Sequence, residues 1–248
     1  MQAKGKTRVE ALMVGAGDLP LVARVALLSA TLCSGIGAIT HGAPVFAQES
    51  TAVAPDLPAD AESKLAISNM VRQGVMHLRA TGNFSPSEPS TLGEYLISLQ
   101  HLFQLTPPSN PPHFTDVPPG SPYFAAAQAA APYLNRQAMC MGCALSTNLY
   151  PGQPLTRAQS SVALVSILNA RGALPLVDDA TANQALENVE DARRLSPLGR
   201  RLVATGISGR IVSLSATHKA DLSSIETRAS SAALLNRVQT KFQLPEVH

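Results

Sequence analysis

The residues with the clearest chemical potential are two closely spaced cysteines, Cys140 and Cys143, in the run Cys-Met-Gly-Cys. Such a pair carries redox chemistry when a helix start stabilises one thiolate, and it binds zinc when a second pair completes the ligand set. Here the pair follows a predicted helix and precedes a proline-rich turn, and the sequence has no second pair. We expect a local disulfide between Cys140 and Cys143 in an exported protein. Free thiols and a redox or metal-binding dithiol are the alternatives.

The histidines and serines do not form a catalytic pattern. None of the six histidines has another four residues away; they are His41, His77, His101, His113, His218 and His248. No serine lies in a nucleophile elbow, and no glycine-rich loop of the phosphate-binding kind connects a strand to a helix. We therefore predict that the protein is not an enzyme, has no metal site and needs no cofactor.

Five arginines lie within eighteen residues of one another: Arg193, Arg194, Arg200, Arg201 and Arg210. A solvated helix face is one interpretation of this cluster. A patch for an anionic polymer is the other.

The elements that would position such residues begin at three similar stretches. Thr156 with Gln159 three positions later is typical of a capping box at a helix start, after Pro151 and Pro154. The same pattern occurs 65 residues earlier at Thr91, and a weaker copy occurs 71 residues later at Thr227. Three caps at nearly even spacing predict a repeat, with helices starting near residues 91, 156 and 227.

The segment upstream of Thr156 completes a recognisable unit. Phe114-Thr115-Asp116-Val117 precedes an alanine-rich helix, then the turn glycine Gly142 and the Pro-x-x-Pro-Leu-Thr-Arg run that ends at Arg157. In order and spacing this unit resembles the S-layer homology repeat. The resemblance implies an all-α fold in which three two-helix repeats form a pseudo-threefold helical bundle. The repeats would span residues 48–105, with a flexible lead-in, 106–172 and 173–248, the third being degenerate.

The resemblance also implies a binding site. Domains of this family hold anionic cell-wall polysaccharide in grooves between their lobes, and the arginine of the Thr-Arg motif pairs the polymer's carboxylate. Carried over, these residues are Arg157 in the second repeat and Arg228 in the third, whereas the first repeat has Leu92. Asp116 and Gly142 are the other positions that the resemblance assigns to polymer binding. Each could instead be structural, as a helix cap or a turn residue.

Residues 1–47 are predicted to be a signal peptide. A basic leader precedes the uncharged apolar run 25–39, and Val45-Phe46-Ala47 places small residues where a signal peptidase cleaves. Fifteen apolar residues are fewer than the ~20 that a membrane span needs, so we expect no stable transmembrane segment after cleavage.

Charge argues against nucleic-acid binding. The chain has 19 basic and 17 acidic residues, and removing the four basic and two acidic residues of the leader leaves 15 of each. We predict an exported module of the cell envelope, in the periplasm or at the cell surface, which binds wall polysaccharide or peptidoglycan. The alternative is a protein–protein or self-assembly module of the envelope with no sugar binding. A third candidate is a periplasmic dithiol protein.

Overall fold

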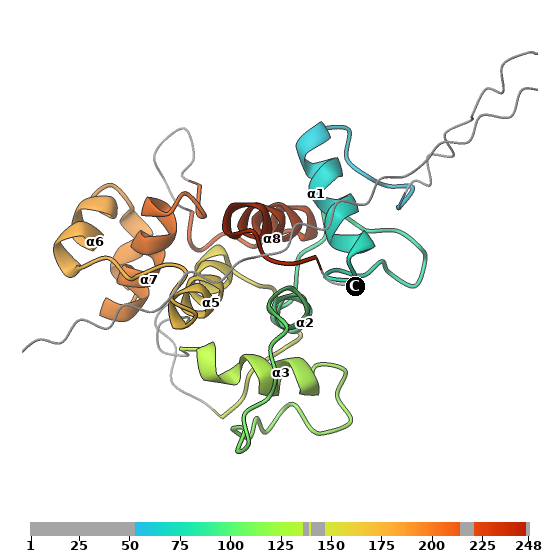
Figure 1. Ribbon diagram of the computed structural model, residues 1–248, viewed down its shortest axis with the longest axis horizontal. Helices are drawn as coiled ribbons and strands as arrows, with labels where there is room; N and C mark the ends of the chain where they lie inside the picture. The colour runs from blue at the N-terminus through green and yellow to red at the C-terminus, as the bar shows by residue number, and fades with distance from the viewer. Residues whose placement is uncertain (1–52, 136–138, 140–146, 214–220, 247–248) are drawn as a thin grey trace, which may run out of the picture. The chain divides into compact units, whose positions relative to one another are not determined.

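A computed structural model describes residues 53–135, 139, 147–213 and 221–246 (Figure 1). All of them belong to one compact unit, Ser50–His248, which is separate from Met1–Glu49. The predicted signal peptide, both cysteines of the Cys-x-x-Cys pair and Gly142 lie outside the described residues.

Within the described residues the chain forms seven α-helices and two short 3₁₀-helices, and no strand. These are α1 (Ala61–Arg72), α2 (Leu92–Phe103), α3 (Phe124–Ala130), η1 (Ala131–Tyr133), α5 (Arg157–Ala170), α6 (Asp179–Ala185), η2 (Glu190–Arg194), α7 (Pro197–Ser208) and α8 (Arg228–Phe242). The all-α prediction is therefore confirmed for this part of the chain. None of these helices is long and apolar enough to cross a membrane.

The three predicted helix starts are confirmed. Thr91, Thr156 and Thr227 are the N-caps of α2, α5 and α8, and each forms a complete capping box with the residue three positions later. The box needs a side chain that can reach back to the N-cap amide, and glutamate, glutamine and serine all do so here.

Prolines and an aspartate set the bounds of the first helices. Asp60 caps α1 by accepting the Ser63 N–H at 2.8 Å, as the sequence predicts. α3 begins at Phe124, so Pro122 lies in the turn before it, and its predicted place in the first turn is wrong. The helix then changes to 3₁₀ geometry at Pro132, which has no N–H to continue the α-helical ladder.

The helices pack in pairs that link distant parts of the chain. Figure 1 shows α2, α5 and α8 at the centre, with α1 beside α8, α3 beside α2 and α7 beside α5. The first described helix therefore packs on the last. α5 is buried on nearly every side, and its Leu164, Ile167 and Leu168 are fully inaccessible.

The segment predicted as a linker, residues 172–183, contains part of an additional helix, α6, capped by Asp178. Two arginines of the cluster hold this region to α7. Arg200 donates to Asn183 Oδ1 at 3.0 Å, and Arg201 Nε donates to the Val177 carbonyl at 2.9 Å. For Arg200 and Arg201 the contacts are internal, so neither is an idle surface charge.

Gly206 does not have the turn role that the sequence suggests for it as an equivalent of Gly74. It lies inside α7, where a Cβ atom would come within 2.8 Å of Val212 and 3.2 Å of Val165, so the glycine allows α7 to approach α5. The turn after α7 takes its positive φ, 53°, at Arg210, as the turn after α1 takes it at Gly74. The earlier assignment is therefore displaced by four residues, because only the backbone shows where each helix ends.

Candidate functional site

The turns that precede α2, α5 and α8 meet and bond to one another in a closed cycle. The innermost backbone hydrogen bonds, each 2.8 Å long, run from Ser90 N–H to Glu226 C=O, from Leu155 N–H to Ser90 C=O and from Glu226 N–H to Leu155 C=O. Each turn therefore donates to one neighbour and accepts from the other. Since every buried backbone group needs a partner, the three turns depend on one another.

Two further sets of bonds follow the same cyclic order. One set runs, donor first, from Leu92 to Gln153, from Arg157 to Ser224 and from Arg228 to Glu88; the other runs from Gly93 to Pro151, from Ala158 to Leu222 and from Ala229 to Pro86. In both sets, donors and acceptors are displaced by the 65 and 71 residues that separate the three caps. Ser85, Tyr150 and Asp221, at the same displacements, all have positive φ.

Arg157, the first residue of α5, lies in a small cleft. The cleft has a volume of about 130 Å³ and is formed by the start of α5, the segment after α7 and one face of α8. The Arg157 guanidinium donates through Nη2 to the Ser213 carbonyl at 2.7 Å. No carboxylate of the described residues lies within salt-bridge distance of it, although Glu226 also lines the cleft.

A second arginine lines the same cleft, and sequence reasoning missed it. Arg237 of α8 donates through Nη1 to Ser213 Oγ at 2.9 Å and to the Ile211 carbonyl at 3.0 Å. Its only acidic neighbour is Glu62, 4.0 Å away and 84% exposed in its side chain. Arg237 lies nine residues after the Arg228 start of α8, outside any motif, so only the fold brings it beside Arg157.

Arg228, the equivalent first residue of α8, has a different environment. It is 3% exposed, and its Nε and Nη2 donate to the carbonyls of Phe84 and His77 at 2.7 and 2.5 Å. Its guanidinium carbon lies 4.7 Å from the centroid of the Phe84 ring. Glu94 approaches Nη1 at 3.5 Å and also pairs with Arg79. The guanidinium is therefore fully engaged inside the protein.

Burial, together with the charge of Arg79, lowers the pKa of Arg228, while Glu94 acts in the opposite direction. A guanidinium so placed is held as part of the packed structure. The cleft beside it is smaller, about 90 Å³.

The two clefts are built from corresponding residues. Ser213 corresponds to His77 as the carbonyl acceptor of the arginine's Nη2, and Ser230 corresponds to Glu94 as the third residue of the following central helix. The difference that matters is the last one, because a carboxylate neutralises Arg228 whereas a hydroxyl stands at the same helix position near Arg157.

Glu226 is held away from the arginines by hydroxyl groups. Its carboxylate accepts from Ser160 Oγ at 3.2 Å and from Ser230 Oγ, and the residue is 7% exposed. The nearby Tyr95 hydroxyl donates to the Ser160 carbonyl at 3.2 Å, and burial raises the pKa of Tyr95 well above its ordinary value. These contacts stabilise the centre where the turns meet.

Asp116 acts on the backbone. Its two carboxylate oxygens accept the N–H groups of Leu149 and Tyr150 at 2.8 and 2.6 Å, and so it clamps the turn that leads to α5. Asp56 does the same for the turn that leads to α2, accepting from Phe84 and Ser85 at 2.8 and 2.7 Å. Although burial acts to raise the pKa of Asp56, these amide hydrogen bonds lower it overall. Asp116 is thus about one turn of structure away from Arg157, and its contacts are explained without a ligand.

Of the predicted site residues, the structure places Arg157 at an open cleft, Arg228 in a closed one and Asp116 in a turn. Gly142 and the two cysteines lie outside the described residues. Among the described residues, no group of three metal-binding side chains comes together. No family model matches the chain, and no curated protein sequence does either.

Proposed function

We propose that this protein is an exported, non-catalytic module of the cell envelope that binds an anionic wall polymer, polysaccharide or peptidoglycan, in the cleft between Arg157 and Arg237. Its three repeats of the S-layer homology kind are arranged about an approximate threefold axis. The protein acts in the periplasm or at the cell surface, and it does not bind nucleic acid.

The threefold arrangement is supported by the cyclic bonds between the three turns and by the pairing of α1 with α8. If the repeats are equivalent, each set of bonds must close on itself with displacements of 65 and 71 residues, as three sets do. A chance meeting of three unrelated helices has no reason to reproduce the same displacement at backbone donors, acceptors and positive-φ residues.

The observation that carries the binding proposal is the exchange of a carboxylate for a hydroxyl. Arg228 receives the carboxylate of Glu94 from within the chain, whereas Ser230 stands at the corresponding position beside Arg157. A carboxylate on a ligand can therefore occupy the place that Glu94 fills in the other cleft. Two guanidinium groups fixed by Ser213 suit such an anion, because their planar donors pair with both of its oxygens.

Retention of the purified protein on isolated cell-wall material tests this proposal. We expect the double variant Arg157→Ala/Arg237→Ala to lose retention, by about tenfold or more at moderate salt. Arg193→Ala/Arg194→Ala removes the same charge from exposed positions in η2 and is the matched control. Equal retention of both double variants would remove the cleft from the account.

The alternative, a self-assembly module, has one observation in its favour. Pro89, Pro154 and Ile225 occupy corresponding positions in the three turns, and all are exposed; Ile225 is 46% exposed. Light scattering over a range of concentrations separates the two proposals. Concentration-dependent association that Ile225→Ser abolishes would favour assembly, and a monomer at all concentrations would exclude it.

A further inference from the structure

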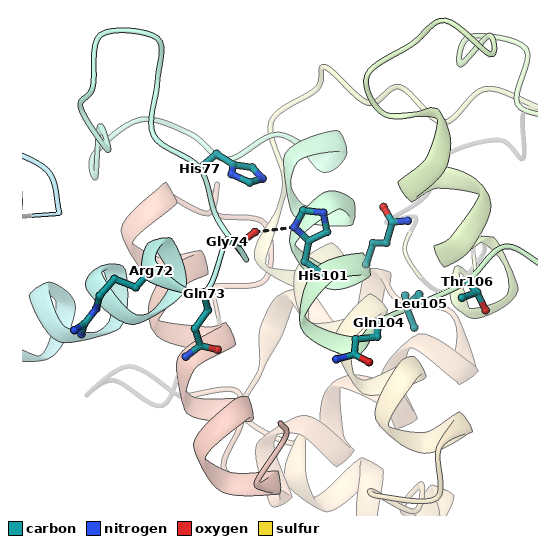
Figure 2. Close-up of a pocket in the computed structure, with 9 residues that line it drawn as sticks. Arg72, Gln73, Gly74, His77, His101, Gln104, Leu105 and Thr106 are labelled. Atoms are coloured by element: carbon teal, nitrogen blue, oxygen red, sulfur yellow. Dashed lines mark hydrogen bonds between the residues drawn. The ribbon is translucent and has the colours of Figure 1, made fainter. Parts of the chain in front are cut away.

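The largest groove in the described part of the chain is distinct from the Arg157 cleft and shares no residue with it. Its volume is about 760 Å³, and it lies between the end of α1 and the second half of α2 (Figure 2). This volume is within the range of small-molecule binding sites, about 300–1,000 Å³. Nothing in the proposed function uses this groove.

Amide side chains dominate the polar surface of the groove. Figure 2 shows Gln73 on the α1 side and Gln104 on the α2 side, and Gln100 adds a third amide from α2. Neither Gln100 nor Gln104 has a side-chain hydrogen bond within the described residues, whereas Gln73 accepts one from Gln239. Each free amide offers two donors and one carbonyl acceptor in one plane.

Two imidazoles line the inner part of the groove. The rings of His77 and His101 meet edge to face, with centroids 5.6 Å apart. His101 Nδ1 lies 2.7 Å from the Gly74 carbonyl, which can only accept, so Nδ1 carries the proton and Nε2 is left as an acceptor in the neutral ring. The hydrogen bond also fixes the orientation of the ring (Figure 2).

The charge of the lining restricts the ligand. No aspartate or glutamate lines the groove, and Arg72 is tied to its own helix through Ser68 and Asn69. A cationic ligand would therefore find no counter-charge. An uncharged ligand with many hydroxyl groups would find paired donors and acceptors on the amides and an acceptor on His101.

We propose that this groove binds a short segment of uncharged saccharide chain. Adjacent hydroxyl groups match the donor and acceptor of one glutamine amide, and the C–H face of a sugar ring packs on the imidazoles and on Leu105. A peptide ligand is less well served, because extended peptides are bound by pairing with an exposed strand edge, and helix side chains form both described walls.

A titration of the full chain with neutral tetramers of glucose and of N-acetylglucosamine tests this inference by the side-chain amide resonances of Gln100 and Gln104. We expect these resonances to shift with one of the tetramers, and Gln100→Leu/Gln104→Leu to raise its Kd by about tenfold or more. Gln153→Leu, at an exposed position in the turn before α5, is the matched control and should leave the Kd unchanged.

Three results would overturn the proposal. They are the absence of shifts at tetramer concentrations on the order of 10 mM, an unchanged Kd in the double glutamine variant, and equal shifts with a capped tetra-alanine peptide. Because the groove does not include Arg157 or Arg237, Arg157→Ala/Arg237→Ala should bind the tetramer normally. Failure of the saccharide groove and failure of the anion cleft are therefore distinguishable.

Discussion

The clefts beside Arg157 and Arg228 have the same construction but different contents. In each, an arginine at the start of a central helix donates to a carbonyl of the segment that follows an outer helix, Ser213 in one cleft and His77 in the other. Glu94 completes the Arg228 cleft from within the protein, and the arginine is buried. The Arg157 cleft lacks that carboxylate and gains Arg237. One exchange at a helix position can thus separate a structural ion pair from a binding site.

Removing each arginine should produce the largest contrast. Arg228→Ala leaves Glu94, Arg79 and two carbonyls without their buried partner, so we expect the free energy of unfolding to fall by about 3 kcal/mol. Arg157→Ala removes one hydrogen bond at an exposed site and should cost less than about 1 kcal/mol. Chemical denaturation of both variants measures this difference. Equal losses would show that the two arginines have the same role.

Moving one carboxylate should close the open cleft. The double variant Glu226→Ser/Ser230→Glu reproduces the Ser90 and Glu94 arrangement without changing net charge, and glutamate at the third helix position preserves the capping box. We expect the internal carboxylate to pair with Arg157 and to reduce retention on wall material by about tenfold.

The matched control for this exchange is Glu226→Ser/Ser230→Gln. Glutamine already serves at the same position in α5, where Gln159 completes the capping box, and it brings no charge. Full retention by the glutamate variant would contradict the idea that the Arg157 cleft is open because it lacks a carboxylate.

Acidification should distinguish the two clefts by a smaller effect. Partial burial, His101 and Arg228 lower the pKa of His77, so the unfolded chain binds a proton more readily than the folded chain. Stability should therefore decrease as the pH falls through the ordinary histidine value near 6.5, and level off below the folded value. Glu94 and Arg79, which also line the Arg228 cleft, keep their charges across this window.

The variant His77→Ser carries the residue found at the corresponding position of the Arg157 cleft, and it should weaken this pH dependence. Thermal unfolding of both proteins between pH 5 and pH 7 provides the comparison. Because His77 is exposed, we expect the effect to be the smallest of those described here. An unchanged pH profile in the variant would assign the titration to other groups.

Local chemistry explains what the sequence could predict. A capping box is a contact between residues three positions apart, so Thr91, Thr156 and Thr227 could be identified from the chain alone, and their spacing gave the displacements seen in the backbone bonds. Proline without an N–H likewise predicted the end of α3.

Long-range contacts explain what the sequence could not predict. The meeting of Arg157 and Arg237 at Ser213 joins three elements, and no spacing along the chain marks it. Arg210 takes a backbone conformation in which glycine would be expected, which is why Gly206 was assigned to the wrong place. The groove of Gln100 and His101 depends on how α1 lies against α2, and that is also decided by packing.

The most direct test follows the arginine Nε–H resonances of the protein while a soluble, carboxylate-bearing fragment of wall polymer is added. Arg157 and Arg237 should shift together and saturate, whereas Arg228, enclosed by Glu94 and Phe84, should not move. A shift of Arg228 with the other two unchanged, or no shift of any of the three, would contradict the account.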